Sequence, residues 1–213
     1  MKTWLITGCS SGIGRGIAKA ALQKGYQVVA TARRLETVQD LTAAYPQRAL
    51  AAALDVTKPD SIRKALQAAE ERFGPVDVLV NNAGHGYRAA LEEGEDNNVS
   101  ELFQTNLFGP VALMKAVLPQ MRRQKAGAII NVSSIAAVCA VVGSGYYAAT
   151  KGALELLSDA LRQEVAPLGI TVMTVEPGAF RTRFFDDSLK GTAVKIKDYA
   201  ETAGKNRKEH IIN

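Results

Sequence analysis

The chain has 213 residues, of which 47% are hydrophobic and 22% are charged, and this composition excludes a disordered protein, a collagen-like repeat and a disulfide scaffold. Basic residues outnumber acidic ones by 26 to 21, but they are dispersed among the acids, so we expect no nucleic-acid partner. The longest apolar run, residues 135–142, is too short to span a membrane. The start of the chain lacks the apolar stretch of a secretory signal and the two cysteines, Cys9 and Cys139, lie far apart, so we expect a cytoplasmic protein.

Short apolar runs alternate with helical patterns along most of the chain. We predict strands at residues 3–7, 27–32, 49–54, 76–81, 128–132 and 170–175. We predict helices at residues 14–24, 36–44, 59–73, 99–124 and 147–166. This alternation implies right-handed crossovers and an α/β fold, in which a doubly wound parallel sheet lies between two helical layers, as in the Rossmann fold. Such sheets bind ligands at the carboxyl ends of their strands.

A glycine-rich turn joins the first predicted strand to the first predicted helix. It reads Thr-Gly-Cys-Ser-Ser-Gly-Ile-Gly over residues 7–14. Glycines permit a tight turn and a close approach to a pyrophosphate, and the helix N-terminus supplies N–H groups to the phosphates. The spacing G-x-x-x-G-x-G differs from the usual dinucleotide fingerprint, so a purely structural turn remains an alternative for this motif alone.

The end of the second predicted strand indicates the cofactor. A free ribose 2′-hydroxyl is usually held by an acidic residue at this position, but residues 30–34 read Ala-Thr-Ala-Arg-Arg. The guanidinium of Arg33 suits a 2′-phosphate, and Ser11 would donate its hydroxyl to the same group. We therefore predict NADP(H) in preference to NAD(H). The alternative is that Arg33 and Arg34 are solvated at the start of the next helix.

A tyrosine and a lysine form the candidate acid–base pair. Tyr147 and Lys151 are four residues apart, so both lie on one face of a helix. A tyrosine titrates near pH 10 in water, and a nearby cation lowers its pKa. Reduction of a carbonyl needs such a group, because the developing alkoxide must take a proton. By itself this spacing is common on helix surfaces.

Other polar residues occur where this chemistry needs them. Ser134 ends a predicted strand 13 residues before Tyr147, where its hydroxyl would polarise a carbonyl. Asn106 lies in a helical pattern that Pro110 interrupts, which leaves room for a kink and a bound water. Residues 81–84, Asn-Asn-Ala-Gly, close the fourth predicted strand, where small side chains admit a cofactor.

Taken together, these motifs resemble those of the classical short-chain dehydrogenase/reductase family, in order and spacing, over nearly the whole chain. The matching elements are Thr7-Gly8-(x)3-Gly12-Ile13-Gly14, Asp55-Val56, Asn81-Asn82-Ala83-Gly84, Asn106, Ser134, Tyr147-(x)3-Lys151 and Pro177-Gly178 with Thr182. The glycine-rich loop and the Ala-Thr-Ala-Arg segment are similar to the hydroxysteroid and retinol dehydrogenase subgroup, which favours NADP(H).

The resemblance implies a role for each matching residue. Tyr147 would be the general acid/base, Lys151 would lower its pKa and hold the nicotinamide ribose, and Ser134 would bind the substrate oxygen. Asn106 would complete a proton relay through water to Lys151, and Asp55 would hold the adenine amino group. The expected cofactor-binding residues are Gly8, Ser10, Ser11, Gly12, Ile13, Gly14, Arg33, Asp55, Val56, Asn82, Ala83, Gly84, Tyr147, Lys151, Pro177, Gly178, Phe180 and Thr182.

Each assignment has a simpler structural alternative. Asp55 would instead cap the helix after Pro59, and Asn106 would instead satisfy a kinked helix. The neighbouring Ser133 rivals Ser134, but strand alternation points the two side chains in opposite directions. The two cysteines are expected to be small packing residues, and His85 and His210 lack partners at metal-ligand spacing, so we expect no metal.

The sequence thus predicts an NADP(H)-dependent oxidoreductase that transfers a hydride between nicotinamide and a secondary alcohol or ketone of apolar character. The alternative is a non-catalytic NADP(H)-binding regulator on the same fold. We expect one domain over residues 1–213, in which residues 181–213 form a mobile substrate lid or tail without a clear strand. Because family members continue through another helix and strand, the strand at 170–175 is expected at an open sheet edge, and we also consider a homo-oligomer.

Overall fold

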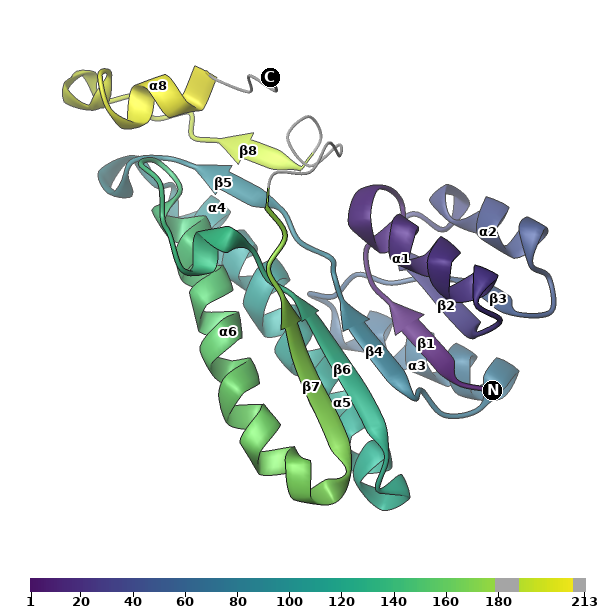
Figure 1. Ribbon diagram of the computed structural model, residues 1–213. Helices are drawn as coiled ribbons and strands as arrows, with labels where there is room; N and C mark the ends of the chain where they lie inside the picture. Colours follow the sequence, from purple (N-terminus) through teal and green to yellow (C-terminus); the bar gives the residue numbers. More distant parts are fainter. Residues whose placement is uncertain (179–187, 209–213) are drawn as a thin grey trace.

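The computed structural model describes residues 1–178 and 188–208, and a twisted sheet of six parallel strands forms its centre (Figure 1). In spatial order the strands are β3 (Ala49–Ala53), β2 (Gln27–Ala32), β1 (Thr3–Ile6), β4 (Val78–Asn81), β6 (Gly127–Val132) and β7 (Ile170–Val175). The order reverses between β1 and β4, which is where sheets of this kind bind ligands. The predicted fold class is confirmed, and every predicted strand is present within two residues of its expected bounds.

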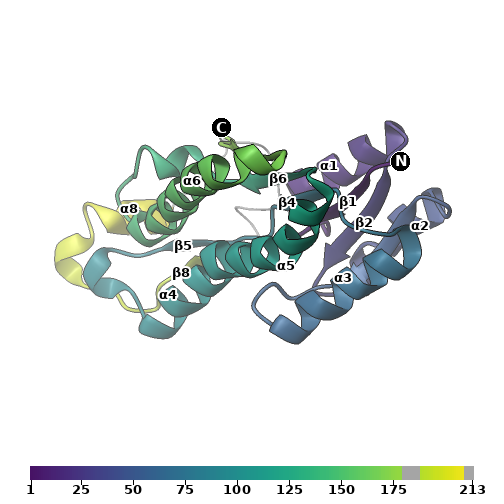
Figure 2. The same cartoon turned by 90° about the horizontal axis from the view of Figure 1, so that it is seen from below.

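Helices cover both faces of the sheet. On one face lie α1 (Gly12–Gln23) and α2 (Gln39–Ala44), whose apolar side chains pack against β1 and β2. On the other face lie α3 (Pro59–Phe73), α5 (Gly109–Gln124) and α6 (Gly145–Val165). Figure 2 shows α3 and α5 along the same side of the sheet. β7 is at the edge, as expected, and Met173 and Val175 on it are exposed.

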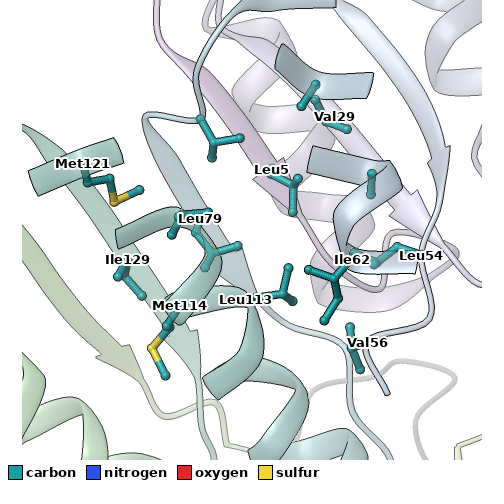
Figure 3. Close-up of a cluster of buried hydrophobic side chains, with 14 of the residues drawn as sticks. Leu5, Val29, Leu54, Val56, Ile62, Leu79, Leu113, Met114, Met121 and Ile129 are labelled. Carbon is teal, nitrogen blue, oxygen red and sulfur yellow. The ribbon is translucent and has the colours of Figure 1, made fainter. Parts of the chain in front are cut away.

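Buried side chains between the sheet and α3 and α5 fix the loops that follow the strands (Figure 3). Leu79 and Ile129 of the sheet and Leu113 of α5 are fully buried, and burial of each such side chain is worth about 1.5–3 kcal/mol. The loop after β3 is held in the same cluster, because a Cβ on Gly109 would lie only 2.8 Å from the Cγ2 of Val56. The core therefore positions residues 55–57 at the carboxyl edge of the sheet.

The predicted helix at 99–124 is interrupted in the structure. It consists of α4 (Asp96–Phe103), a π-helical turn (Gln104–Phe108) and α5, and Pro110 lies in the first turn of α5 rather than at the break. Such π-turns occur as single turns within otherwise α-helical segments, frequently at functional sites. The predicted helix at 36–44 is likewise a 3₁₀ turn (Leu35–Thr37) followed by α2.

A small second sheet lies beyond the carboxyl ends of β4, β6 and β7 (Figure 1). It pairs β5 (Gly86–Arg88) with β8 (Leu189–Gly191) in parallel, and α8 (Ala203–Lys208) follows. The expectation that the tail contains no strand is therefore wrong. In the described part of the chain, no helix is long and apolar enough to cross a membrane.

Candidate active site

A cavity of about 620 Å³ lies along the carboxyl edge of the sheet, at the point where the strand order reverses. One part of the cavity is lined by the glycine-rich turn, by the ends of β2 and β3 and by residues 82–88. The rest is lined by residues 132–136, by the first turns of α6 and by the segment after β7. Its size is typical of sites for small molecules and cofactors.

The glycine-rich turn is packed against the end of β4. Gly8 has a φ of 71°, and a Cβ there would lie 2.9 Å from the Cα of Ala83. The side-chain amide of Asn82 donates to the carbonyl oxygens of Thr7, at 2.9 Å, and Gly8, at 3.2 Å. Thr7 Oγ1 accepts the backbone N–H groups of Asn82 and Ala83, each at 2.9 Å. Asn82 and Ala83 therefore shape the turn as well as lining the cavity.

The N-terminus of α1 opens into the cavity. Ser11 is its N-cap residue but makes no side-chain capping hydrogen bond, and no acidic residue lies in the first turn. The cavity is lined here by Ser10, Ser11, Gly12 and Ile13, and all four are at least partly exposed to solvent. Unpaired N–H groups and the positive end of the helix dipole make such an N-terminus an anion site.

Two arginines follow β2, and the structure separates them. Arg33 is exposed and lines the cavity, and within residues 1–178 and 188–208 it forms no ion pair. Arg34 does not line the cavity, and its Nε lies 3.7 Å from Oε1 of Glu36. Of the two, only Arg33 is available to a ligand in the cavity.

Asp55 lines the cavity next to Val56, and its carboxylate also has a local role. Its Oδ1 accepts the backbone N–H of Thr57 at 2.9 Å and the hydroxyl of Thr57 at 2.7 Å. The N-cap residue of α3 is Lys58, so Asp55 does not cap that helix. One oxygen of the carboxylate stabilises the loop, and no hydrogen bond to Oδ2 is present among the described residues.

The hydroxyl of Ser134 and the phenol of Tyr147 form a side-chain hydrogen bond at the cavity wall. Ser134 follows β6 and caps a 3₁₀ turn, with its Oγ accepting the N–H of Ala136 at 3.1 Å. The neighbouring Ser133 is buried, and its Oγ has no hydrogen-bond partner among the described residues. Ser134, rather than Ser133, thus contacts the phenol.

Burial governs the ionisation of both Tyr147 and Lys151. Burial raises the pKa of Tyr147, and the hydrogen bond with Ser134 opposes this shift without cancelling it. Burial lowers the pKa of Lys151 to about 8, against the opposing charge of Glu155. The Nζ of Lys151 donates to the carbonyl oxygen of Val132 at 2.8 Å and lies 5.9 Å from the centroid of the Tyr147 ring. The expected lowering of the Tyr147 pKa by Lys151 is therefore not observed, because desolvation of the phenol dominates.

Asn106 lies in the π-helical turn, fully buried next to Lys151 and Gly84. Its side-chain amide donates to the carbonyl oxygen of His85 at 2.8 Å, and its Oδ1 accepts the N–H of His85 at 3.0 Å. A Cβ on Gly84 would lie 3.1 Å from Oδ1 of Asn106 and 3.7 Å from Nζ of Lys151. The side chain of Asn106 thus holds the segment after β4 against the lysine, and it contacts the backbone of His85 rather than Lys151.

Some of the remaining predicted site residues line the cavity and others do not. Pro177 and Gly178 line the cavity, whereas Phe180 and Thr182 lie outside the described residues. Gly14 is buried behind the glycine-rich turn, where a Cβ would lie 2.3 Å from Nδ2 of Asn82. Cys9 is a buried packing residue, as predicted, but Cys139 is exposed at the cavity, so the same prediction for Cys139 is wrong.

Sequence reasoning missed the residues at the outer end of the cavity. Arg88 on β5, Lys190 on β8 and Glu101 on α4 all line it, and Nζ of Lys190 lies 2.7 Å from Oε2 of Glu101. These three side chains come from distant parts of the chain, so no local pattern marks them. Within residues 1–178 and 188–208, no three His, Cys, Asp or Glu side chains are grouped to hold a metal.

Comparisons with known proteins agree with this geometry. The model of the short chain dehydrogenase family matches residues 2–192. The chain belongs to this family. Among curated relatives, the oxidoreductase BOA17 of Botryotinia fuckeliana is 39% identical over 204 residues, which cover 95% of this chain and 74% of that protein. This short-chain dehydrogenase is accordingly an oxidoreductase.

Two solved structures are similar to the chain as well. A short-chain dehydrogenase from Streptomyces avermitilis has a TM-score of 0.92 and 47% identity, covering 97% of this chain and 78% of that one. A metagenomic short-chain oxidoreductase in complex with NADP has a TM-score of 0.78 and 32% identity, covering 84% of this chain and 83% of that one.

Proposed function

We propose that this short-chain dehydrogenase transfers a hydride between NADP(H) and a secondary alcohol or ketone, with Tyr147 as general acid/base. The observation that carries the proposal is the hydrogen bond between Ser134 and Tyr147 at the cavity wall, with the ammonium of Lys151 buried behind the phenol. A hydroxyl donor and a phenol that face one cavity are what a carbonyl oxygen needs as it becomes an alkoxide.

The residues present suit NADP(H). The open N-terminus of α1 would take the pyrophosphate, and Arg33 would take the ribose 2′-phosphate, since no carboxylate occupies the end of β2. Asp55, Val56, Ala83, Gly84, Pro177 and Gly178 would line the rest of the cofactor. The NADP in the metagenomic relative supports the same choice for this chain.

In the reduction direction, Tyr147 would act as the proton donor. Because burial raises its pKa, the phenol is protonated at neutral pH and ready to give its proton to the substrate oxygen. Ser134 would hold that oxygen beside the phenol, and bound NADPH would supply the hydride to the carbonyl carbon. Lys151 would hold the nicotinamide ribose, and Asn106 would keep residues 84–85 against the lysine and serve the proton relay.

We also propose a subgroup, a cellular compartment, a domain organisation and an oligomeric state for this protein. The loop Gly-Cys-Ser-Ser-Gly-Ile-Gly followed by Arg33 supports the hydroxysteroid and retinol dehydrogenase subgroup. Two free cysteines, one of them exposed, support a reducing cytoplasm. We assign residues 1–213 to one domain, whose C-terminal part, from residue 181 on, would serve as the substrate lid. Exposed Leu156 and Leu157 on α6 support a homo-oligomer.

The experiment is a panel of ketones and secondary alcohols assayed by nicotinamide absorbance, with Tyr147→Phe beside the wild type. We expect Tyr147→Phe to lower turnover by about 10²–10⁴-fold and to leave the Kd for NADPH unchanged. Tyr146→Phe is the matched control, since that neighbouring hydroxyl donates to the carbonyl oxygen of Leu91 at 2.7 Å. A wild type that binds NADPH but turns over nothing in the panel would favour the non-catalytic regulator, and unaltered turnover in Tyr147→Phe would refute the mechanism.

A further inference from the structure

β5 and β8 form the outer end of the cavity. The charged side chains of Arg88, Lys190 and Glu101 line this end. Along β5, both Tyr87 and Arg88 line the cavity; Tyr87 is almost fully buried, whereas Arg88 is only partly buried. Arg88 is held in this position by the ladder in which it pairs with Gly191 of β8. Backbone pairing with β8 thus fixes the place of Arg88.

The guanidinium of Arg88 is partly buried without a counter-ion in the described part of the chain. Among the described residues its side chain makes one hydrogen bond, in which Nη1 donates to the carbonyl oxygen of Asn206 at 3.2 Å. Burial lowers the pKa of Arg88, which means that water stabilises its charge less than on an open surface. A desolvated cation is normally paired, because its lost hydration otherwise costs free energy.

The neighbouring cation provides a comparison within the same cavity. Lys190 lies on β8 directly before Gly191, the residue that pairs with Arg88. Its Nζ forms an ion pair with Oε2 of Glu101, at 2.7 Å. The cavity as a whole carries excess positive charge. Among the described lining residues, four are cations, Arg33, Arg88, Lys151 and Lys190, and two are carboxylates, Asp55 and Glu101.

We propose that the substrate carries an anionic oxygen group, a carboxylate or a phosphate, and that Arg88 binds it. This inference rests on the proposed function and adds the substrate class. Arginine's planar donors suit either group, which would pair with a charge that no described residue neutralises. The hydrocarbon part of the substrate would lie against Ile135 and Val141, which line the cavity and are more than half exposed.

The first test measures binding and needs no turnover. Octanoate, octyl phosphate and octan-1-ol are titrated calorimetrically into the protein loaded with NADP+. We expect at least one anion to bind about 10- to 100-fold more tightly than the neutral alcohol, and the tighter of the two identifies the group. Arg88→Met, which keeps an apolar stem, should remove this preference, and Lys190→Met should retain it because that charge already has a partner.

The second test measures turnover of a medium-chain keto acid and its methyl ester. Arg88→Met should raise KM for the acid by about 10- to 100-fold and leave the ester within about threefold, whereas Arg88→Lys should recover part of the loss. Equal losses for acid and ester would mean that Arg88 only anchors Asn206, and would overturn the inference. Equal binding of anion and alcohol by the wild type would overturn it too, while turnover of neutral ketones would leave the proposed function standing.

Discussion

The ammonium of Lys151 donates a 2.8 Å hydrogen bond to the carbonyl oxygen of Val132, and this bond joins α6 to the carboxyl end of β6. Lys151 is 5% exposed, so the fold carries a buried cation at this junction. The same junction sets Tyr147, one helical turn earlier, beside Ser134, which follows β6. The contact between α6 and the end of β6 therefore both positions the Tyr147 phenol and buries the Lys151 ammonium, which costs free energy.

The burial of Lys151 predicts a specific dependence of stability on pH. Its pKa is 10.5 in an exposed chain and about 8 in the folded protein, so between these values the unfolded state binds more protons and stability rises with pH. We expect the free energy of unfolding of the wild type, relative to Lys151→Met, to increase by about 3 kcal/mol between pH ~7 and pH ~10.5. Urea unfolding of both proteins across this range measures the difference. Glu155→Gln should move the rise to lower pH, because Glu155 raises the Lys151 pKa, and a difference that stays flat would contradict the prediction.

The two adjacent serines after β6 are expected to differ in how much their mutation affects activity. Ser134→Ala removes the hydroxyl that contacts the Tyr147 phenol, so kcat/KM should fall by about 10²-fold. It also removes the hydrogen bond that lowers the Tyr147 pKa, so the pH profile of alcohol oxidation should move to higher pH. Ser133→Ala is the control. Its buried hydroxyl has no hydrogen-bond partner among the described residues, so activity and stability should stay near wild type, and a comparable loss of activity in both variants would refute this assignment.

The sheet was predictable because its strands are buried on both faces. A strand such as Gln27–Ala32 reads as an apolar run bounded by turn residues, and that signal is local. The same holds for the glycine-rich turn and for the spacing of Tyr147 and Lys151, whose partners lie nearby in sequence or on the same helix. These features needed no knowledge of tertiary contacts.

The outer end of the cavity was not predictable for the opposite reason. β5 and β8 have three residues each and pair across about a hundred residues of chain, as with Gly86 and Leu189, so neither carries a pattern of its own. The direction of the Tyr147 pKa shift was also beyond the sequence. The spacing to Lys151 favours a lowered value, but desolvation, which depends on the whole fold, raises it.

Arg33 and Arg34 allow a direct test of the cofactor preference. Arg33→Ala should raise the Kd for NADPH by about 10- to 100-fold, because a charge-assisted contact to the 2′-phosphate is lost, and should leave the Kd for NADH within about threefold. Arg34→Ala is the matched control, since its guanidinium is directed to Glu36 and does not line the cavity. Fluorescence titration with both nucleotides measures the four constants, and equal losses for NADPH and NADH would refute the preference.

Two adjacent glutamates predict how the tail is attached to the domain. Glu93 is fully buried, and its Oε2 accepts the N–H of Ala90 at 3.1 Å while its Oε1 accepts the N–H of Ile196 at 2.8 Å. Among the described residues, the side chain of Glu92 meets the tail through one hydrogen bond, which it accepts from the exposed hydroxyl of Tyr199. Glu93→Ala leaves both amides without their acceptor, so hydrogen exchange at Ile196 should accelerate about 10- to 100-fold. Glu92→Ala should leave that rate within about threefold, and similar acceleration in the two variants would show that the tail is not held by Glu93.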